Sequence, residues 1–232
     1  MGVYAVVLGG GSGQRMGGKE NKVFLSLRSI PAIVRAIVPF SALCEGVVIV
    51  ARRDEVEDME KVLERFGLKR LVLSVCAGGE DRQASVAQGL KNLPRDADVV
   101  LIHDGARALV TEQVIQNVID SVLENGSGVA AVPVSDTIKR ADKEGRVEET
   151  LLRENLFAMQ TPQGFRTADL RRAHEKAEKE GYRATDDAAL LEYAGMQVHL
   201  CRGDGENIKL TTPMDRALAE MILQNREERE GR

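Results

Sequence analysis

Short apolar runs alternate with amphipathic segments along the first part of the chain. Five runs are apolar or β-branched at most positions, which predicts buried strands at 3–7, 46–51, 71–77, 98–103 and 129–134. Between them, apolar residues recur at helical spacing, and we expect helices at about 30–40, 54–66, 81–93 and 111–124. Ser29 and Thr111 stand where helix caps are expected, and Gly67 stands where a helix should stop.

This alternation is typical of βαβ units. It predicts an α/β protein of the Rossmann-like type, in which a mostly parallel sheet carries helices on both faces. Ligands of such sheets bind beyond the carboxyl ends of the strands. Glycine and charge gather at three of these ends, in the stretches 8–22, 78–81 and 103–107. We therefore expect the ligand site at this edge of the sheet.

The pattern changes at residues 136–150, which are polar and have Lys143-Glu144-Gly145 at their centre. They predict two short strands joined by a turn. The segment has too few apolar residues for a core of its own, so two interpretations stay open. It is either a mobile surface hairpin or an arm that packs on a partner subunit.

The remainder returns to the α/β pattern. We expect a strand at 157–161 that Pro162 ends, a helix at 167–180, and a helix capped by Thr185. Short strands are expected at 197–200 and 208–210. Thr212 and Pro213 should start a last helix that ends near Gln224, before a frayed tail. No linker or repeat divides the chain, so we predict one domain over 1–232, with an arm at about 136–156.

Composition narrows the class of partner and the compartment. The net charge of −4 over 232 residues argues against a nucleic-acid binder, which usually has a basic face. The three cysteines are far apart in the sequence, which fits reduced thiols. The N-terminus does not resemble a signal peptide, and no apolar run approaches membrane length. We expect a cytoplasmic protein that binds neither nucleic acid nor membrane.

The stretch from Leu8 to Lys22 is the strongest candidate for a ligand site. It follows the first strand and holds six glycines and three cations, Arg15, Lys19 and Lys22. Glycine allows sharp turns and lets backbone N–H groups approach a ligand closely. N–H groups together with cations suit a polyanion such as a triphosphate. The alternative is a flexible surface turn, in which Lys22 is an ordinary exposed lysine.

Two common phosphate motifs fail in this stretch. The dinucleotide fingerprint fits Gly11 and Gly13, but its third glycine is Met16. The P-loop motif fits Gly13 through Lys19, but Glu20 stands where a Ser or Thr must supply a Mg²⁺ ligand. The loop is therefore a phosphate loop of another kind, with its cations on the C-terminal side. Asp104, at the end of a strand, is a natural Mg²⁺ ligand, although it could instead cap the following turn.

Seven short motifs in order along the chain support a family assignment. They are 8–16 (L-G-G-G-S-G-Q-R-M), 79–86 (G-E-D-R-Q-A-S-V), 102–107 (I-H-D-G-A-R), 136–139 (D-T-I-K), 160–165 (Q-T-P-Q-G-F), 185–187 (T-D-D) and 207–213 (N-I-K-L-T-T-P). In this set the chain resembles the 2-C-methyl-D-erythritol 4-phosphate cytidylyltransferase family, within the nucleotidyltransferases that activate sugar and polyol phosphates. Members join CMP from CTP to methylerythritol phosphate and release pyrophosphate, in a step of isoprenoid precursor synthesis.

The resemblance implies a role for each matching residue. The catalytic cations would be Arg15, Lys22 and Lys209, and Asp104 would hold Mg²⁺. The nucleotide would meet the Gly-rich loop and the second motif, at Gly9, Gly10, Gly11, Gly13, Gly79, Glu80 and Ser85. Methylerythritol phosphate would meet Arg107, Thr137, Arg153 and Thr185. The arm would clasp a second subunit, which favours a homodimer over the mobile hairpin.

Two rival functions remain at this point. One is the related transfer to ribitol 5-phosphate, although Arg153 and Leu156-Phe157 look more like the methylerythritol family. The other is a nucleotide-binding regulatory module without turnover, although every charged group that the chemistry needs is present. The chain departs from the family pattern at Gly9-Gly10, Asn21, Glu80, Gly105 and Ala108. Extra glycine predicts a more mobile loop, so the affinity for CTP is the property that these changes put in doubt.

Overall fold

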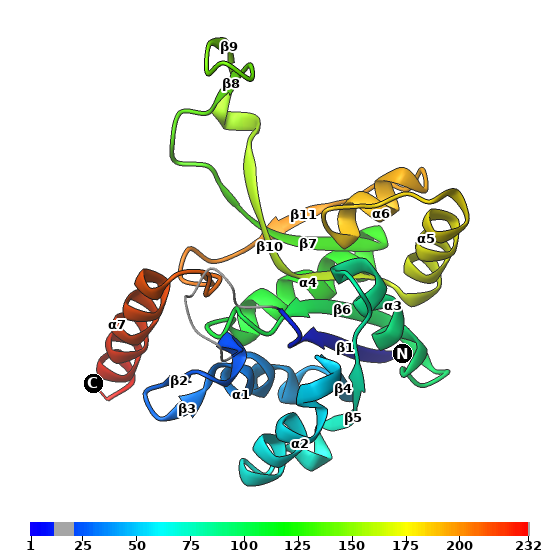
Figure 1. Cartoon of the computed structure of the whole chain (residues 1–232), viewed down its shortest axis with the longest axis vertical. Helices are drawn as coiled ribbons and strands as arrows, with labels where there is room; N and C mark the ends of the chain where they lie inside the picture. Colours follow the sequence, from blue (N-terminus) through cyan, green and yellow to red (C-terminus); the bar gives the residue numbers. More distant parts are fainter. Residues whose placement is uncertain (12–20, 232) are drawn as a thin grey trace.

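The computed structural model describes residues 1–11 and 21–231, and a seven-stranded sheet lies at its centre. Its strands are β1 (Gly2–Leu8), β4 (Gly46–Ala51), β5 (Val72–Ala77), β6 (Ala97–Asp104), β7 (Ser127–Pro133), β10 (Phe157–Arg166) and β11 (Leu200–Arg202). The order across the sheet is β11-β7-β10-β6-β1-β4-β5 (Figure 1). Strand β10 runs antiparallel to β6 and β7, and every other pair of neighbours is parallel. The predicted mostly parallel α/β sheet is confirmed.

Helices cover both faces of this sheet. The first layer contains α1 (Ala32–Ile37), α2 (Val56–Arg65) and α4 (Glu112–Asn125), and the second contains α3 (Arg82–Lys91), α5 (Thr167–Glu180) and α6 (Asp187–Tyr193). A hydrophobic core lies between the sheet and each helix layer, and alternate strand residues pack into one core or the other. Ala5 and Val7 of β1 pack in the first, and Tyr4 and Val6 pack in the second. The nearly continuous apolar strands are therefore explained by burial on both faces.

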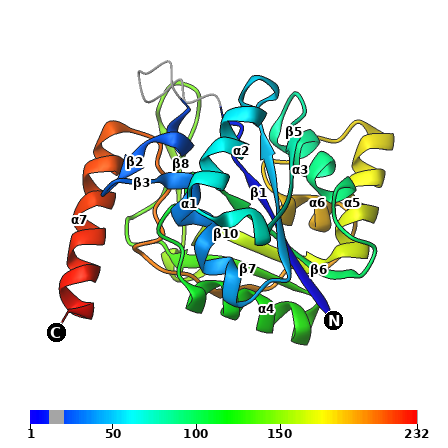
Figure 2. The ribbon, with the colours of Figure 1, turned by 90° about the horizontal axis from the view of Figure 1, so that it is seen from below.

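A third core lies beside the sheet and belongs to the last helix, α7 (Pro213–Glu230). Its Ala219, Ile222 and Leu223 pack with Leu109 and Leu210. In Figures 1 and 2, α7 lies on the opposite side of the molecule from α5 and α6. This packing places the segment before α7, which carries Lys209, beside the chain that leaves β6.

The predicted arm is present as a hairpin. It consists of β8 (Lys139–Ala141) and β9 (Val147–Thr150), which pair antiparallel and form a sheet of their own. Figure 1 shows it extending away from the central sheet. Its side chains are largely exposed, including Val147 at 61% and Leu152, just beyond β9, at 70%. Within the described part of the chain, no helix is both long and apolar enough to span a bilayer.

Two predicted helix caps are wrong. Ser29 lies in the turn between the short strands β2 (Ser26–Leu27) and β3 (Ile30–Pro31), with φ of +65°, and α1 begins only after Pro31. Thr185 does not cap α6, because Asp186 does: its Oδ1 accepts a hydrogen bond of 3.0 Å from the backbone N of Ala189. In both regions a neighbouring residue has the extended backbone that a cap requires.

Three other predictions near the C-terminal half are also wrong. Strand β10 continues past Pro162, because its register with β7 is irregular between Met159 and Gln163 and a residue without an N–H is tolerated there. Residues 208–210 form no strand, although the backbone N of Leu210 donates to Ala106 O at 2.8 Å. The last helix does not end near Gln224. It continues because Arg226 bonds to Glu206 Oε2 at 2.8 Å and to Leu109 O at 3.1 Å.

Candidate active site

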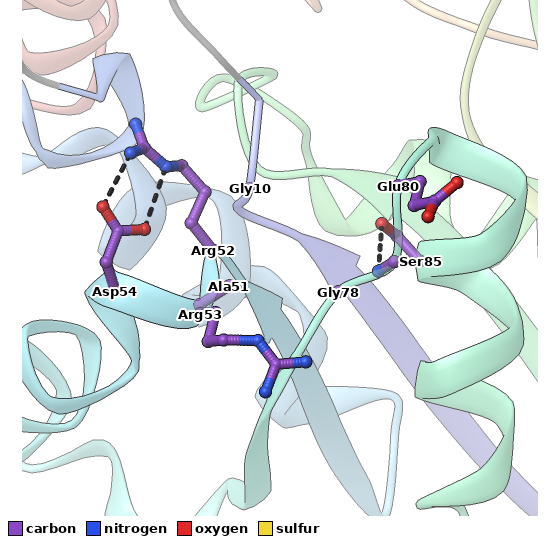
Figure 3. Close-up of a pocket in the computed structure, with 9 residues that line it drawn as sticks. Gly10, Ala51, Arg52, Arg53, Asp54, Gly78, Glu80 and Ser85 are labelled. Atoms are coloured by element: carbon purple, nitrogen blue, oxygen red, sulfur yellow. Dashed lines mark hydrogen bonds and ion pairs between the residues drawn. The ribbon is translucent and has the colours of Figure 1, made fainter.

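The carboxyl ends of β1, β4 and β5 meet at an open pocket of about 400 Å³. Figure 3 shows it from close by, with strand ends on both sides and the start of α3 at one edge. The pocket is lined by Gly10, Ala51, Arg52, Arg53, Asp54, Gly78, Gly79, Glu80 and Ser85. It therefore joins the Gly-rich stretch to the second motif, at the edge of the sheet where the sequence places the ligand.

Two of the pocket glycines stand where a side chain would be crowded, tightly at Gly10 and with a clash at Gly79. A Cβ on Gly10 would lie 3.3 Å from the backbone N of Arg52. A Cβ on Gly79 would lie 2.4 Å from the Cβ of Ala84 and 3.0 Å from its carbonyl carbon. Glycine at these positions lets two backbone segments come close together, so that main-chain groups form the walls of the pocket.

The turn that leads into α3 is held by its own side chains. Asp81 caps the helix, with its Oδ1 accepting from the backbone N of Ala84 at 2.7 Å. The hydroxyl of Ser85 accepts from the backbone N of Gly79 at 3.1 Å and donates to Asp81 O at 2.8 Å. Ser85 therefore fixes the shape of the turn, and its contact with a nucleotide stays a prediction. Glu80 lies exposed at the rim of the pocket (Figure 3).

The end of the Gly-rich stretch is tied back to its beginning by Asn21. The side-chain amide of Asn21 donates to Gly9 O at 2.6 Å and to Glu55 Oε2 at 2.7 Å, and Asn21 is 2% exposed. The backbone N of Gly9 donates to Val50 O at 2.7 Å. Lys22 follows directly and begins the 3₁₀ turn η2 (Lys22–Phe24). A Cβ on Gly11 would lie 3.9 Å from Lys22 Cε, so this lysine lies against the glycine stretch.

Gly13 and Arg15 lie outside the described residues. Of the other cations that the sequence assigns to the site, Lys209 is brought to the end of β6. There its Nζ lies 2.6 Å from Asp104 Oδ2. Asp104 pairs with Leu8 in the register of β6 and β1, so the two functional stretches begin side by side. The sequence analysis named both residues, with separate roles, and the fold brings them together although they are 105 positions apart in the chain.

A second cation, Arg82 at the start of α3, faces the same carboxylate. Its Nε lies 3.6 Å from Asp104 Oδ1, and its Nη1 lies 2.6 Å from Asp187 Oδ2. Burial alone would raise the pKa of Asp104, but Lys209 and Arg82 more than offset it and lower that pKa to about 2. Burial likewise opposes the charge on Arg82, yet Asp187 and Asp104 raise its pKa above the ordinary value. Asp104 and Arg82 are therefore both charged near neutral pH.

His103 is fully buried and links the residues on either side of Asp104. Its Nε2 lies 3.2 Å from Arg107 O, which can only accept, so Nε2 carries the hydrogen. Its Nδ1 lies 3.0 Å from Thr161 Oγ1. Burial lowers the pKa of His103 to about 4 despite the nearby Asp104. His103 is thus a neutral, hydrogen-bonded residue of the strand end rather than a metal ligand.

The predicted substrate residues divide into two groups. Arg107 lies in the loop after β6, where its Nη1 donates to Asn207 O at 2.7 Å and its Nη2 to Met159 O at 3.3 Å. It therefore connects the Asp104 loop to the segment that carries Lys209. Thr137, Arg153 and Thr185 are exposed. Thr137 and Arg153 lie at the base of the arm, where Arg153 Nη1 donates to Ser135 O at 2.7 Å, and Thr185 precedes α6.

Asp104 fits a Mg²⁺ site at which the phosphates of a bound nucleotide supply further ligands. Among residues 1–11 and 21–231, no three His, Cys, Asp or Glu side chains gather in a group that could hold a metal ion. Mg²⁺ at nucleotide sites is usually bound by one or two carboxylates together with phosphate oxygens and water. A single ionised carboxylate at the strand end meets that requirement.

Three residues of this site were not predicted to act in it, although each lies in a quoted motif. Arg82 follows Glu80-Asp81 in the second motif, Thr161 lies in Q-T-P-Q, and Asp187 ends T-D-D. For Asp187, the helix dipole at the start of α6 offered a sufficient local explanation. Its main partner, Arg82, is 105 positions away, and nothing in the local pattern indicates that contact.

Comparisons with known proteins agree with this geometry. The family model for 2-C-methyl-D-erythritol 4-phosphate cytidylyltransferase matches residues 3–225. Relatives of that name from Bacillus pumilus and Thermosynechococcus vestitus are 43% and 42% identical, over 95% and 98% of this chain and 96% and 98% of their own lengths.

A solved structure agrees as well. The 4-diphosphocytidyl-2C-methyl-D-erythritol synthase of Anaerococcus prevotii superposes with a TM-score of 0.85 at 26% identity, over 96% of this chain and 98% of that one. Fold and sequence therefore both match over almost the whole length. The chain belongs to the 2-C-methyl-D-erythritol 4-phosphate cytidylyltransferase family.

Proposed function

We propose that the protein transfers CMP from CTP to 2-C-methyl-D-erythritol 4-phosphate and releases pyrophosphate. The observation that carries this proposal is the register of β1 against β6. It sets Asp104 and its partner Lys209 beside the start of the Gly-rich stretch. The pocket for a nucleotide and the charges for phosphoryl chemistry thus lie at one edge of the sheet.

The base and the ribose belong in the pocket between β1, β4 and β5. Backbone groups around Gly10 and Gly79 can meet the edge of a base, since glycine at both positions leaves the main chain uncovered by a side chain there. The carboxylate of Glu80 can accept from the exocyclic amine of cytosine, whereas it would repel the carbonyl oxygen of uracil. This favours CTP as the nucleotide.

The reaction is an in-line displacement at the α-phosphorus. An oxygen of the acceptor phosphate forms a bond to this phosphorus, and the bond to the oxygen that bridges the α- and β-phosphates breaks, so that pyrophosphate leaves with that oxygen. Catalysis of such steps consists mainly of positioning and of stabilising negative charge. We assign the stabilisation to Lys22 and Lys209, together with Arg15. Asp104 would hold a Mg²⁺ ion, which when bound neutralises phosphate charge.

The acceptor is proposed to meet Arg107 and Thr185 on one subunit and the arm of another. Thr137 and Arg153 lie at the base of an exposed arm that extends from the sheet. A homodimer in which each arm reaches the partner's pocket would bring them to the reaction. Leu152 and Val147, which are largely exposed in one chain, would then be covered. We further propose that residues 1–232 act as one domain, and that the enzyme is cytoplasmic.

The cation roles can be tested by replacing Lys22 and Lys209 separately with Gln. Each variant should bind CTP within about tenfold of wild type, while turnover falls by about 10²- to 10³-fold, because the charge is needed most in the transition state. Lys69 pairs with Glu64 at the surface, far from the strand ends that form the site, and Lys69→Gln is the matched control. Unchanged turnover in either site variant would refute the role given to that lysine.

A further inference from the structure

Arg82 lies between two carboxylates that belong to different parts of the fold. Its Nη1 is 2.6 Å from Asp187 Oδ2, and its Nε is 3.6 Å from Asp104 Oδ1. The shorter contact therefore goes to the residue on α6, and the longer one to the residue at the end of β6. Arg82 itself is partly buried, with 29% of its side chain exposed.

Hydrogen bonds between Gln163 and the backbone hold Asp187 in place. The backbone N atoms of Asp187 and Ala188 donate to Gln163 Oε1 at 3.2 and 3.1 Å, and Gln163 Nε2 donates to Asp186 Oδ2 at 2.8 Å. The start of α6 is thereby fixed to β10. Because the position of α6 is set by Gln163, the carboxylate of Asp187 is a fixed anchor for Arg82 rather than a mobile partner.

The Asp187 carboxylate depends on Arg82 for its charge balance. It is 0% exposed, and in the described part of the chain neither oxygen has another hydrogen-bond donor, while His174 Nε2 is 3.8 Å from Oδ1. A buried carboxylate is stable only beside a compensating charge. The guanidinium of Arg82 therefore lies closer to Asp187 than to Asp104, and it neutralises Asp104 less fully than a close ion pair would.

The other oxygen of Asp104 is already paired. Lys209 Nζ lies 2.6 Å from Oδ2. Arg82 Nε lies 3.6 Å from Oδ1. A cation at Asp104 Oδ1 competes with any metal ion for the same carboxylate. The position of Arg82 thus bears directly on how available Asp104 is as a ligand.

We propose that Asp187 is a positioning residue that keeps Arg82 from closing onto Asp104, and so preserves the affinity of Asp104 for a divalent metal ion. This rests on the proposed role of Asp104 as the Mg²⁺ ligand. Without the charge of Asp187, the guanidinium would have Asp104 as its nearest anion and would neutralise it more fully. Asp187 touches neither nucleotide nor metal in this account and acts only through Arg82.

The test is binding of Mn²⁺ in the presence of saturating CTP and absence of acceptor, so that nothing turns over. Free Mn²⁺ is followed by electron paramagnetic resonance, and CTP binding in EDTA is measured first for each variant. Asp187→Asn should weaken Mn²⁺ binding by about tenfold, since an opposite charge at this range shifts a carboxylate's affinity for a cation by about that factor or more. Asp187→Glu, which keeps the charge, should recover most of the loss.

The decisive variant removes both charges. Arg82→Gln with Asp187→Asn should bind Mn²⁺ at least as tightly as wild type, because no guanidinium remains to compete for Asp104. A purely structural role for Asp187 predicts no such reversal. If Asp187→Asn alone does not fold, the double variant, which leaves no unpaired buried charge, carries the test by itself. Weaker Mn²⁺ binding in a folded double variant would overturn the proposal.

Two further variants separate this proposal from the function on which it rests. Asp104→Asn should abolish the protein's own contribution to Mn²⁺ binding at saturating CTP, and if it does not, the metal role of Asp104 is wrong. If Asp104→Asn does abolish that contribution but Asp187→Asn leaves Mn²⁺ binding unchanged, only the positioning role of Asp187 is wrong. Glu227→Gln, which breaks the pair between α7 and Arg28 in the turn after β2, is the matched control for loss of a carboxylate.

Discussion

The hydroxyl of Thr161 on β10 accepts a hydrogen bond of 3.0 Å from the backbone N of Asp104 on β6. Because His103 Nε2 carries the ring hydrogen, His103 Nδ1 is an acceptor, and Thr161 donates to it at 3.0 Å. The hydroxyl of Thr161 therefore serves as donor and acceptor at once. This contact sets the position of the backbone that carries the proposed metal ligand.

Replacement of Thr161 by Val should destabilise the protein. It would leave the buried backbone N of Asp104 without a partner, which costs about 1–3 kcal/mol of the free energy of unfolding. Thr161→Ser keeps the hydroxyl and is the control. Urea unfolding of the three proteins measures the difference, and equal stability of the Val and Ser variants would show that this hydrogen bond contributes little.

The buried His103 should make stability depend on pH. Its pKa of about 4 in the folded protein lies below the ordinary value of 6.5, so the unfolded chain binds the proton more readily. This contribution is complete above pH 6.5 and is lost as the pH falls from there towards 4. Between pH 7.5 and 5.0 the free energy of unfolding should fall by about 2 kcal/mol on account of this residue.

The comparison that isolates His103 is its replacement by Gln, which does not titrate. The variant will be less stable at pH 7.5, but its free energy of unfolding should depend less steeply on pH than that of wild type. Parallel pH profiles for the two proteins would contradict a neutral buried His103.

Asn21 should be required for the structure of the Gly-rich stretch. Asn21→Ala removes the buried amide that bonds to Gly9 O and Glu55, and should cost about 1–3 kcal/mol in the free energy of unfolding. It should also raise the KM for CTP, because Gly9 adjoins the pocket residue Gly10. Asn92→Ala is a control, since Asn92 bonds at the exposed end of α3. An unchanged KM would mean that this tie does not shape the nucleotide site.

Gly79→Ala should impair nucleotide binding more than folding. The new methyl group would meet Ala84 at 2.4 Å, so the turn before α3 must move away from its present place in the pocket. A displacement of this size at a site can lower kcat/KM for CTP by about 10- to 100-fold. Gly205, where a Cβ would meet nothing within 4 Å, gives the control Gly205→Ala. Equal kcat/KM in the two variants would remove Gly79 from the nucleotide site.

The architecture follows from local pattern more completely than the site does. The apolar run 46–51 has its observed bounds, because burial on both faces of a sheet leaves a continuous apolar run in the sequence, and the helix predicted at 167–180 also has its observed bounds. The errors occurred where tertiary contacts override local preference. Arg226 extends α7 through bonds to Glu206 and Leu109, and neither contact has a local signal.

The candidate site was predictable where a single strand end carries the chemistry. Gly10, Gly79 and Asp104 stand at such ends, and their placement follows from the fold. The link between Arg82 and Asp187 was not predictable in the same way, because Asp187 already has a satisfactory local role at the start of α6 and no local pattern points from Arg82 to a residue 105 positions away. Long-range ion pairs of this kind become visible only once the helices are placed.

The most direct test of the account is release of pyrophosphate from CTP in the presence of Mg²⁺, with a panel of acceptors. The panel is methylerythritol 4-phosphate, ribitol 5-phosphate and a sugar 1-phosphate. The account predicts turnover with methylerythritol 4-phosphate and none with the other two. Turnover with ribitol 5-phosphate instead would contradict the proposed substrate, and a folded protein that binds CTP but releases no pyrophosphate with any acceptor would contradict the proposed reaction itself.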